Sequence, residues 1–309
     1  EGCLSQVRLN HIYSAIKECC KEHSYPIEPT CRFIHVSRSA YYDWLNGKVG
    51  DRISENERIA EWIEKIYTED DSKGYRRIHD DLVSPTGEYR LKINRKRVLR
   101  ICRIKGFKST IKYRNRGCTR NASNPAHIAE NILNREYHAE KPNEKWVTEV
   151  TEFKWYEYTG TEFIKHKIYL SAILDLCDRR IVSYVIGDRN DNSLVFRTFN
   201  LAVENNPNAH PLFHSDRGFQ YTNLQFHKKI ITAGMTQSMS RVGKCIDNGP
   251  MEGFWGILKR ERYYGRKFTS REELIHMIES YILYYNNRRI QRNLGRMTPA
   301  LKHELAMAA

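Results

Sequence analysis

The chain has 309 residues, 40% of them hydrophobic and 11% aromatic, which is enough apolar material for two or three folded domains and argues against a wholly disordered chain. No apolar run reaches the roughly 18 residues of a membrane helix, the N-terminus lacks the pattern of a secretory signal, and the eight Cys form no CxxC pair, so we expect no membrane partner, zinc site or disulfide framework. The formal net charge of +14 favours a polyanionic partner.

Residues 1–48 are predicted to form a first helical unit. In the stretch "VSRSAYYDWLNG", Ser37 suits the N-cap of a short helix and Gly47 suits the position just after its end. A short helix that presents Ser37 and Arg38 after a turn is typical of a helix-turn-helix that reads DNA. An ordinary helical hairpin accounts for these residues equally well.

Residues 52–106 are predicted to form a second helical unit. Its last helix, "NRKRVLRICRIKG", begins after Asn94 as N-cap and stops at Gly106. The apolar residues of this helix are expected to face inward, which leaves its basic residues for a major groove or a phosphate backbone. The predicted DNA contacts of this unit are Arg76, Arg77, Arg95, Lys96, Arg97, Arg100 and Arg103.

The positive charge is concentrated between Tyr89 and Arg120, where thirteen residues are Lys or Arg and none is Asp or Glu. Such a density favours nucleic acid, because Lys and Arg that neutralise phosphates release condensed counterions. A solvated basic surface is the simpler alternative. Residues 107–143 have no convincing period and contain two X-Pro pairs, so they are predicted to be a basic linker.

Residues 144–265 change in character and predict an α/β domain. Three strand-like runs are followed by a helix, a strand, a helix, a strand and a helix. This order indicates a mixed five-stranded sheet with helices on both faces, preceded by the all-α units. Residues 266–309 are predicted to be a final helix, "SREELIHMIESYILYYNNRR", and a basic tail.

Three acidic residues stand out by position: Glu149 within the first strand, Asp216 at the end of the short strand "LFHSD", and Glu252 at the start of a helix. Crowded carboxylates repel one another, so a cation gives them a reason to converge, and two hard Mg²⁺ ions with oxygen ligands would form a phosphoryl-transfer site. Each acid also has a simple solvated explanation, and a chain with 37 acids offers many such trios. Lys259 lies on the same helix face as Glu252, and His214 shares a strand face with Asp216, which suits a supporting role.

Three stretches resemble the catalytic subunit of bacterial transposases of the insertion-sequence-3 group: "HSDRGFQYT", "SMSRVGKCIDNGPMEGFWGILKRE" and "YYNNRRIQRNLGRMTPA". This group belongs to the retroviral-integrase-like class with an Asp-Asp-Glu triad, and the 35 residues between Asp216 and Glu252 match its spacing. "KGYRRIHDDL", "INRKRVLRIC" and "VSRSAYYDWL" are similar to the DNA-binding units upstream of that core. The resemblance implies a ribonuclease-H-like catalytic core.

The resemblance also implies the chemistry. Asp216 and Glu252 would be catalytic, metal-binding acids, with Glu149 at the first triad position and Lys259 in contact with the transposon end. Two Mg²⁺ ions, or Mn²⁺ in their place, would serve cleavage at terminal inverted repeats of double-stranded DNA and attack of the freed 3′-hydroxyl on target DNA. A homodimer or higher oligomer on paired ends is implied, in the bacterial cytoplasm at the nucleoid. An upstream helix-turn-helix and coiled-coil segment is also implied, which would make Glu1 an internal residue.

The first triad position departs from the family pattern, which resembles Trp-x-Thr-Asp-x-Thr, whereas this chain has Glu149 where the pattern has Asp. The carboxylate is kept but sits one methylene further out, and metal ligation tolerates errors of only a few tenths of an ångström. We therefore expect the fold and DNA binding to survive and strand cleavage to be weakened or lost. Glu152 is expected on the opposite strand face. A catalytically inactive or domesticated DNA-binding derivative is the alternative, and a nuclease that cuts without joining is a third reading.

Overall fold

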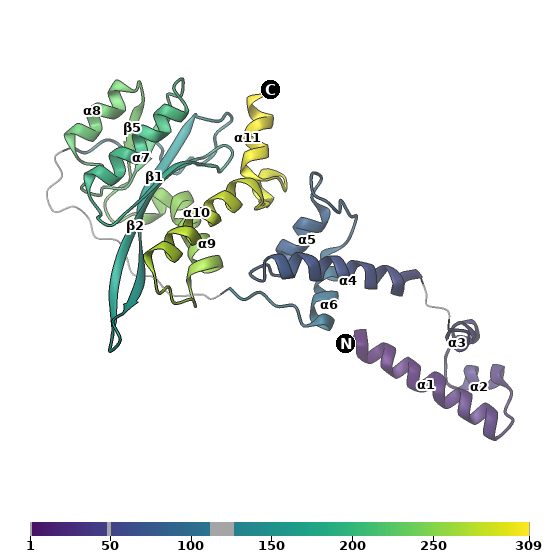
Figure 1. Cartoon of the computed structure of the whole chain (residues 1–309). Helices are drawn as coiled ribbons and strands as arrows, with labels where there is room; N and C mark the ends of the chain where they lie inside the picture. The colour runs from purple at the N-terminus through teal and green to yellow at the C-terminus, as the bar shows by residue number, and fades with distance from the viewer. Residues whose placement is uncertain (1, 48–50, 112–126, 309) are drawn as a thin grey trace. The chain divides into compact units, whose positions relative to one another are not determined.

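A computed structural model of the chain describes residues 2–47, 51–111 and 127–308 (Figure 1). The chain divides into two compact units, Glu1–Thr110 and Ile111–Ala309, each of which is described by itself. The basic residues Lys112, Arg114, Arg116 and Arg120 of the predicted linker lie outside the described residues. In the part of the chain that the structure covers, no helix is long and apolar enough to cross a membrane.

Among the described residues of the first unit, every regular element is a helix. Its helices are α1 (Gly2–Glu22), α2 (Ile27–Phe33), α3 (Arg38–Leu45), α4 (Asp51–Glu69), α5 (Tyr75–Val83) and α6 (Arg95–Lys105). The helices α1 to α3 close over a small core that includes Ile16 and Tyr41, and a separate core joins α4 to α6. The first unit therefore holds two separate hydrophobic cores.

Helix α6 is bounded as its sequence predicts. The Asn94 side chain accepts a hydrogen bond from the backbone N–H of Lys96 at 2.8 Å, and Gly106 ends the helix with a left-handed φ of 78°. Its residues Val98 and Ile101 are buried against α4 and α5. Burial of this stripe fixes which way the basic residues of α6 point.

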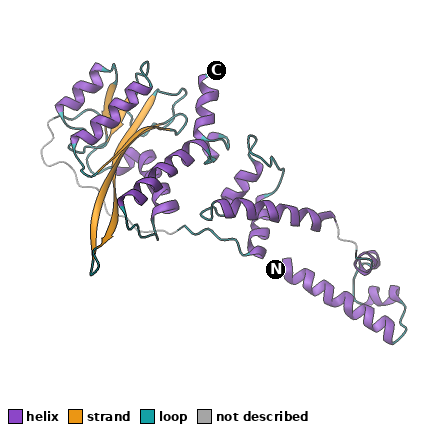
Figure 2. Ribbon diagram, viewed as in Figure 1, coloured by secondary structure: helices purple, strands orange, loops and turns teal. Residues whose placement is uncertain are grey.

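The second unit is built on a five-stranded mixed sheet (Figure 2). Its strands are β1 (Lys145–Tyr158), β2 (Phe163–Asp175), β3 (Ile181–Gly187), β4 (Leu212–Ser215) and β5 (Thr236–Met239). The strand order is β3-β2-β1-β4-β5, with β1, β2 and β3 antiparallel and β4 and β5 parallel to β1. The predicted mixed sheet of a ribonuclease-H-like core is confirmed.

Helices cover both faces of the sheet, as predicted. They are α7 (Asn192–Asn205) and α8 (Leu224–Thr232) on one face and α9 (Gly249–Leu258) and α10 (Arg271–Asn287) on the other. Helix α11 (Pro299–Met307) packs against α10, and the short elements are η1 (Cys245–Asn248), the π-helix η2 (Lys259–Tyr263) and η3 (Arg292–Leu294). Neighbours in β1 point to opposite faces, so Trp146 packs with α7 and α8 whereas Val147 packs with α9 and α10. Both side chains are fully buried, and β1 is therefore the central strand of a three-layered domain.

The described residues that precede β1 pack against the edge of the sheet. The Met239 N–H donates to the Glu130 carbonyl at 3.2 Å, and the Ser238 hydroxyl accepts from the N–H groups of Ile132 and Leu133. Leu133 is buried in the same core as α9. The Met239 bond pairs one backbone group at the outer edge of β5, and the Ser238 hydroxyl fastens the preceding segment there. We refer to residues 127–143 as the edge strap.

Candidate active site

The parallel pairing of β1 with β4 places Glu149 beside Asp216. Thr148 is the partner of Ser215 in this register, so each acid follows directly on a paired residue. Adjacent strands lie about 4.8 Å apart. The two carboxyl groups therefore meet at the same end of the sheet, although 66 residues of chain separate them.

Asp216 is held by the turn that follows β4. Its Oδ1 accepts a hydrogen bond from the Gly218 N–H at 2.9 Å, and a Cβ on Gly218 would lie 3.1 Å from that same oxygen. A side chain at position 218 would therefore press on the carboxylate. The glycine allows the backbone to approach Asp216 closely.

Glu252 reaches the site from the first turn of α9, where Pro250 occupies an early position. The turn before this helix is tied to β1, because the Asn248 side chain donates to the Thr148 carbonyl at 3.1 Å. Asn248 and Thr148 are both buried. This bond couples the start of α9 to the residue immediately before Glu149.

The electrostatics of Glu149 reflect the convergence of the three acids. Burial, the Asp216 carboxylate and the Glu252 carboxylate, in that order, raise the pKa of Glu149 to about 8, while Trp255 and Lys259 act in the opposite sense. Burial also raises the pKa of Asp216, against the hydrogen bond from Gly218. A buried carboxyl whose pKa is raised by burial and by two neighbouring carboxylates is an arrangement that a cation would stabilise.

The carboxylate oxygens of Glu149, Asp216 and Glu252 are chemically suitable ligands for a hard divalent cation. Oxygen is the ligand that Mg²⁺ prefers, and Glu149 Oε2 is buried and has no hydrogen-bond partner among the described residues. The same holds for Nε1 of its neighbour Trp255. Within the described part of the chain, however, no three His, Cys, Asp or Glu side chains are arranged to hold a metal ion as they lie.

Lys259 contacts the same strand as Glu149. Its ammonium donates to the Thr151 hydroxyl at 2.6 Å and to the Glu152 carbonyl at 2.8 Å, and it stands 4.8 Å from the centre of the Phe153 ring. Lys259 begins the π-helix η2, the type of turn that often occurs at functional sites. The structure thus connects the predicted DNA contact to β1 beside the triad.

Glu152 lies on the opposite face of β1 from Glu149, as predicted. Its carboxylate is 2.8 Å from the Lys167 ammonium and 3.6 Å from that of Lys154, and these lysines lower its pKa. Glu152 is therefore engaged away from Asp216 and Glu252.

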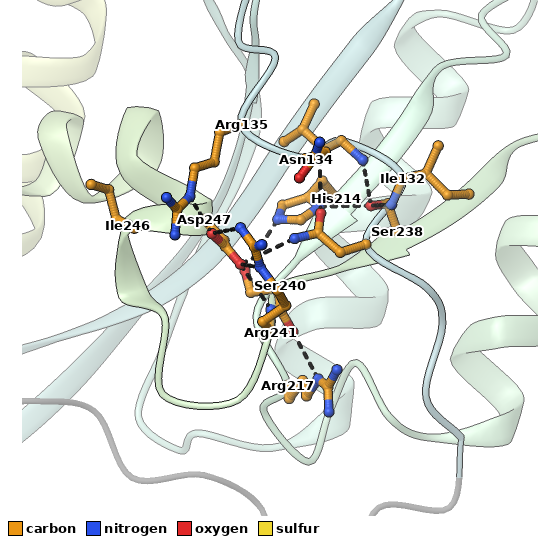
Figure 3. A network of polar contacts seen from close by, with 12 residues as sticks. Ile132, Asn134, Arg135, His214, Arg217, Ser238, Ser240, Arg241, Ile246 and Asp247 are labelled. Carbon is orange, nitrogen blue, oxygen red and sulfur yellow. Dashed lines mark hydrogen bonds and ion pairs between the residues drawn. The ribbon is translucent and has the colours of Figure 1, made fainter.

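A polar network beside the site involves Asp247, a residue that the sequence analysis did not single out. Asp247 is fully buried, and it accepts from Arg241 Nε and Nη2, each at 2.8 Å, and from Arg135 Nε at 2.7 Å (Figure 3). Arg241 is the first cause of a pKa far below the usual range for Asp247. Because Arg135 belongs to the edge strap, the network fastens the strap to the turn that carries Asn248.

His214 lies in β4, two residues before Asp216. Its Nδ1 and Nε2 are 2.9 and 3.1 Å from the hydroxyls of Ser238 and Ser240 (Figure 3). Burial lowers the pKa of His214 to about 4, so the ring is neutral at pH 7. Its contacts join β4 to β5, and its supporting role at the triad stays a prediction.

The predicted DNA contacts of the first unit differ in their partners and in their exposure, and Arg38 is both ion-paired and exposed. Three arginines bind acids of their own unit: Arg38 with Glu28 at 2.8 Å, Arg77 with Asp70 at 3.4 Å, and Arg97 with Glu55 at 2.7 Å. The exposed residues of the prediction are Ser37, Arg38, Arg76, Arg95, Lys96, Arg100 and Arg103. Ser37 occupies the N-cap position of α3, but its hydroxyl bonds to that of Ser39. The sequence pattern could not separate structural arginines from available ones.

Models of known protein families match two parts of the chain. One integrase core domain family matches residues 139–245, and a second family with the same description matches residues 233–299. An HTH-like domain family matches residues 54–115. The first two matches contain the triad positions Glu149, Asp216 and Glu252, and the third contains helices α5 and α6.

Full-length relatives extend these matches. Transposase InsK of insertion sequence element IS150 from Escherichia coli is 34% identical over 89% of this chain and 92% of its own length, and a transposase-like protein from Haemophilus influenzae is 40% identical over 68% and 92%. Transposase InsF of insertion sequence IS3A from E. coli is 26% identical over 89% and 93%. Among solved structures, the HTLV-2 integrase catalytic core domain in complex with magnesium is similar with a TM-score of 0.40 and 16% identity, over 54% of this chain and 99% of that one. The chain belongs to the insertion-sequence-3 group of bacterial transposases, with an integrase core domain and an HTH-like domain.

Proposed function

We propose that the chain binds the terminal inverted repeats of its element and catalyses metal-dependent cleavage and transfer of DNA strands. The observation that carries the proposal is the convergence of Glu149, Asp216 and Glu252 on one end of the sheet, where burial and then the other two acids raise the pKa of Glu149. Acids that crowd in this way suit a metal-dependent phosphoryl-transfer site. Double-stranded DNA is the substrate, and two copies of the chain would hold paired ends.

The three carboxylates would hold two Mg²⁺ ions, with Mn²⁺ as a substitute. Bound there, the metal would lower the pKa of water and neutralise charge on the phosphate in the transition state. Glu149 itself would have to lose its proton, because its pKa of about 8 keeps it mainly protonated at neutral pH. Binding of the cation would therefore release protons from the site.

The surrounding side chains would position these acids. Asn248 fixes the start of α9 relative to β1, and Gly218 orients Asp216. Lys259 would hold β1 through Thr151, and its positive charge beside the triad suits a nearby phosphate of the transposon end. His214, neutral and hydrogen-bonded to β5, would support β4 behind Asp216.

Glu149 is expected to weaken catalysis. The backbone on both sides of β1 is hydrogen-bonded, so the extra methylene must be accommodated by the side chain alone. A misplacement of about 1 Å can cost roughly 100-fold in rate. An inactive derivative that only binds DNA is favoured by this departure, since the helices of the first unit do not depend on Glu149.

Strand cleavage distinguishes the two functions. The chain and its Glu149→Asp and Asp216→Asn variants would be incubated with duplex DNA from the ends of the encoding element, with Mg²⁺ or Mn²⁺. We expect the Glu149→Asp variant to produce more 3′-end cleavage and joined product than the parent, and the Asp216→Asn variant to produce none.

Three results would contradict this scheme. Equal, robust activity with Glu and Asp at position 149 would remove the claim that Glu149 is harmful. Absence of activity in both, with specific binding intact, would favour the inactive derivative. Undiminished cleavage by Asp216→Asn would refute the triad.

A further inference from the structure

The strands β1 and β2 continue beyond the rest of the sheet as a two-stranded hairpin (Figures 1 and 2). Pairing of β1 with β4 ends at Thr148, and pairing of β2 with β3 begins at Tyr169, so residues 153–168 have no third strand beside them. Within this hairpin the register pairs Lys154 with Lys167, Tyr156 with Lys165, and Tyr158 with Phe163. These three pairs lie on one face, because side chains alternate along a strand. We call these six residues the hairpin lysine face.

The base of the hairpin is held in place. The Tyr263 hydroxyl accepts from the Lys154 N–H at 2.9 Å and donates to its carbonyl at 3.1 Å. The Tyr156 N–H donates to the Phe268 carbonyl at 2.9 Å. An isolated hairpin is only marginally stable in water, so these bonds along the outer edge of β1 explain how it projects as an ordered element.

On the opposite face of the hairpin, the polar and aromatic side chains contact one another. The Trp155 ring stacks on His166 with centroids 4.3 Å apart and planes at 17°, and His166 Nε2 is 2.9 Å from the Glu157 carboxylate. Phe153 is buried beneath Lys259. This face therefore has internal partners for its aromatic and charged groups.

The hairpin lysine face has a surplus of positive charge. Lys154 and Lys167 stand directly opposite one another, which is unfavourable for like charges, and the two share the single carboxylate of Glu152. Lys165 is exposed. A fourth ammonium comes from Lys267, which stands 3.0 Å from the Phe163 ring centre and 5.8 Å from that of Tyr156. Four lysines thus face one acid, with Glu162 in the turn nearby.

Aromatic rings alternate with these lysines. Tyr158 is 59% exposed and Phe163 49% exposed. Single exposed apolar residues are ordinary, but rings interleaved with lysines suit nucleic acid, where ammonium groups meet phosphates and rings meet sugars or bases. The shape also fits, because the major groove of B-DNA admits a two-stranded β-ribbon.

We propose that the hairpin lysine face is a DNA-contacting surface of the catalytic unit that binds the phosphate backbone of duplex DNA. It is distinct from the predicted contacts on α5 and α6 and from Lys259. The inference rests on the proposed function, in which duplex DNA is the substrate. A second copy of the chain is a poor occupant, because a two-fold interface would place these lysines against themselves.

The test is the salt dependence of binding to a mixed-sequence DNA duplex. In the full-length chain, Lys154, Lys165 and Lys167 would be replaced together by Ala. Each lost phosphate contact lowers the slope of log K against log salt by about 0.9, so we expect a decrease of up to roughly 2.7 and weaker binding at low salt. The triple replacement by Arg should retain the slope, and Lys228→Ala, which removes an exposed lysine of α8, should leave it unchanged.

The single variant Lys165→Ala guards against misfolding, because it leaves both ion pairs of Glu152 intact. It should lower the slope by about 0.9. An unchanged slope in folded variants would overturn the surface while leaving the proposed function in place. Failure of the parent chain itself to bind DNA would instead reject the proposed function. A change in sedimentation mass without DNA, together with an unchanged slope, would identify the face as a contact between copies.

Discussion

The side chain of Asn248 donates to the backbone carbonyl of Thr148 at 3.1 Å, and this bond joins two segments that are 100 residues apart. Thr148 precedes Glu149, and Asn248 precedes the helix that carries Glu252. One buried hydrogen bond therefore connects the supports of two carboxylates. Because Thr148 Oγ1 also donates to the Ala172 carbonyl at 2.9 Å, the connection reaches β2.

Replacement of Asn248 by Ala should separate stability from catalysis. Loss of the bond leaves the Thr148 carbonyl without this donor and should lower the free energy of unfolding by about 1–3 kcal/mol. Cleavage should decrease more than this loss implies, because Glu252 would no longer be fixed relative to Glu149. Urea titration and cleavage assays, made on the Glu149→Asp background so that activity is measurable, would check both. Undiminished cleavage would show that Asn248 does not position α9.

The raised pKa of Glu149 makes stability depend on pH. The folded protein retains this proton up to a pKa of about 8, whereas the unfolded chain releases it near 4.5. The contribution of Glu149 is therefore complete below pH 4.5 and is lost as pH rises towards 8. We expect the Glu149→Gln variant, which cannot ionise at this position, to gain in melting temperature relative to the parent over that interval.

Added Mg²⁺ provides the matching measurement. An ion held by ionised carboxylates should stabilise the parent chain more at pH 8 than at pH 5, and it should stabilise Asp216→Asn less. Removal of divalent ions by a chelator should reverse the gain. Equal stabilisation of parent and Asp216→Asn at both pH values would argue against a metal site at the triad.

Lys259 should contribute to stability as well as to DNA contact. Its bonds to Thr151 and to the Glu152 carbonyl predict that Lys259→Met destabilises the chain by about 1–3 kcal/mol in the absence of DNA. Lys259→Arg keeps the charge but changes the geometry, so it should recover DNA binding better than cleavage. Thermal unfolding without DNA that is identical in parent and Lys259→Met would assign the lysine to DNA contact alone.

Replacements of the basic residues of α6 should affect either DNA binding or stability, depending on the partner of each residue. Arg95 and Lys96 are exposed, so their joint replacement by Ala should lower the salt slope of DNA binding by about 0.9 for each lost phosphate contact, with the melting temperature preserved. Arg97 pairs with Glu55 and with Asn56 at 2.8 Å, so Arg97→Ala should loosen α6 from α4. An unchanged slope in the Arg95/Lys96 variant would place this pair away from the DNA.

The sequence predicts the chain order of the strands and helices in the second unit, and the face to which strand residues point, because strand and helix periods are local properties. The alternation in β1 explains why Glu149 and Glu152 point to opposite faces, and the caps of α6 were predicted from Asn94 and Gly106. The convergence of the three acids was predicted from family spacing, and the register of β1 on β4 supplies the physical basis for Glu149 and Asp216.

Long-range partners could not be predicted in this way. Arg97 resembles its exposed neighbours in the sequence, and only the packing of α6 on α4 brings it to Glu55, 42 residues away. Asp247 stands in a turn-like stretch, and its burial between Arg135 and Arg241 depends on where the edge strap lies. The hairpin lysine face depends on a cross-strand register, which the sequence alone does not specify.

The central position of β1 in the sheet has a consequence for the evolution of the DNA element that encodes this transposase. Since β1 is paired on both sides at Thr148, the difference between Glu and Asp at the next position is confined to one side chain. Under the proposed function, a transposase built in this way would lose activity by the gain of one methylene and regain it by its loss, with every other part of the scaffold kept. Dormancy of this kind would be reversible in a single mutational step, whereas damage to the strand pairing would not.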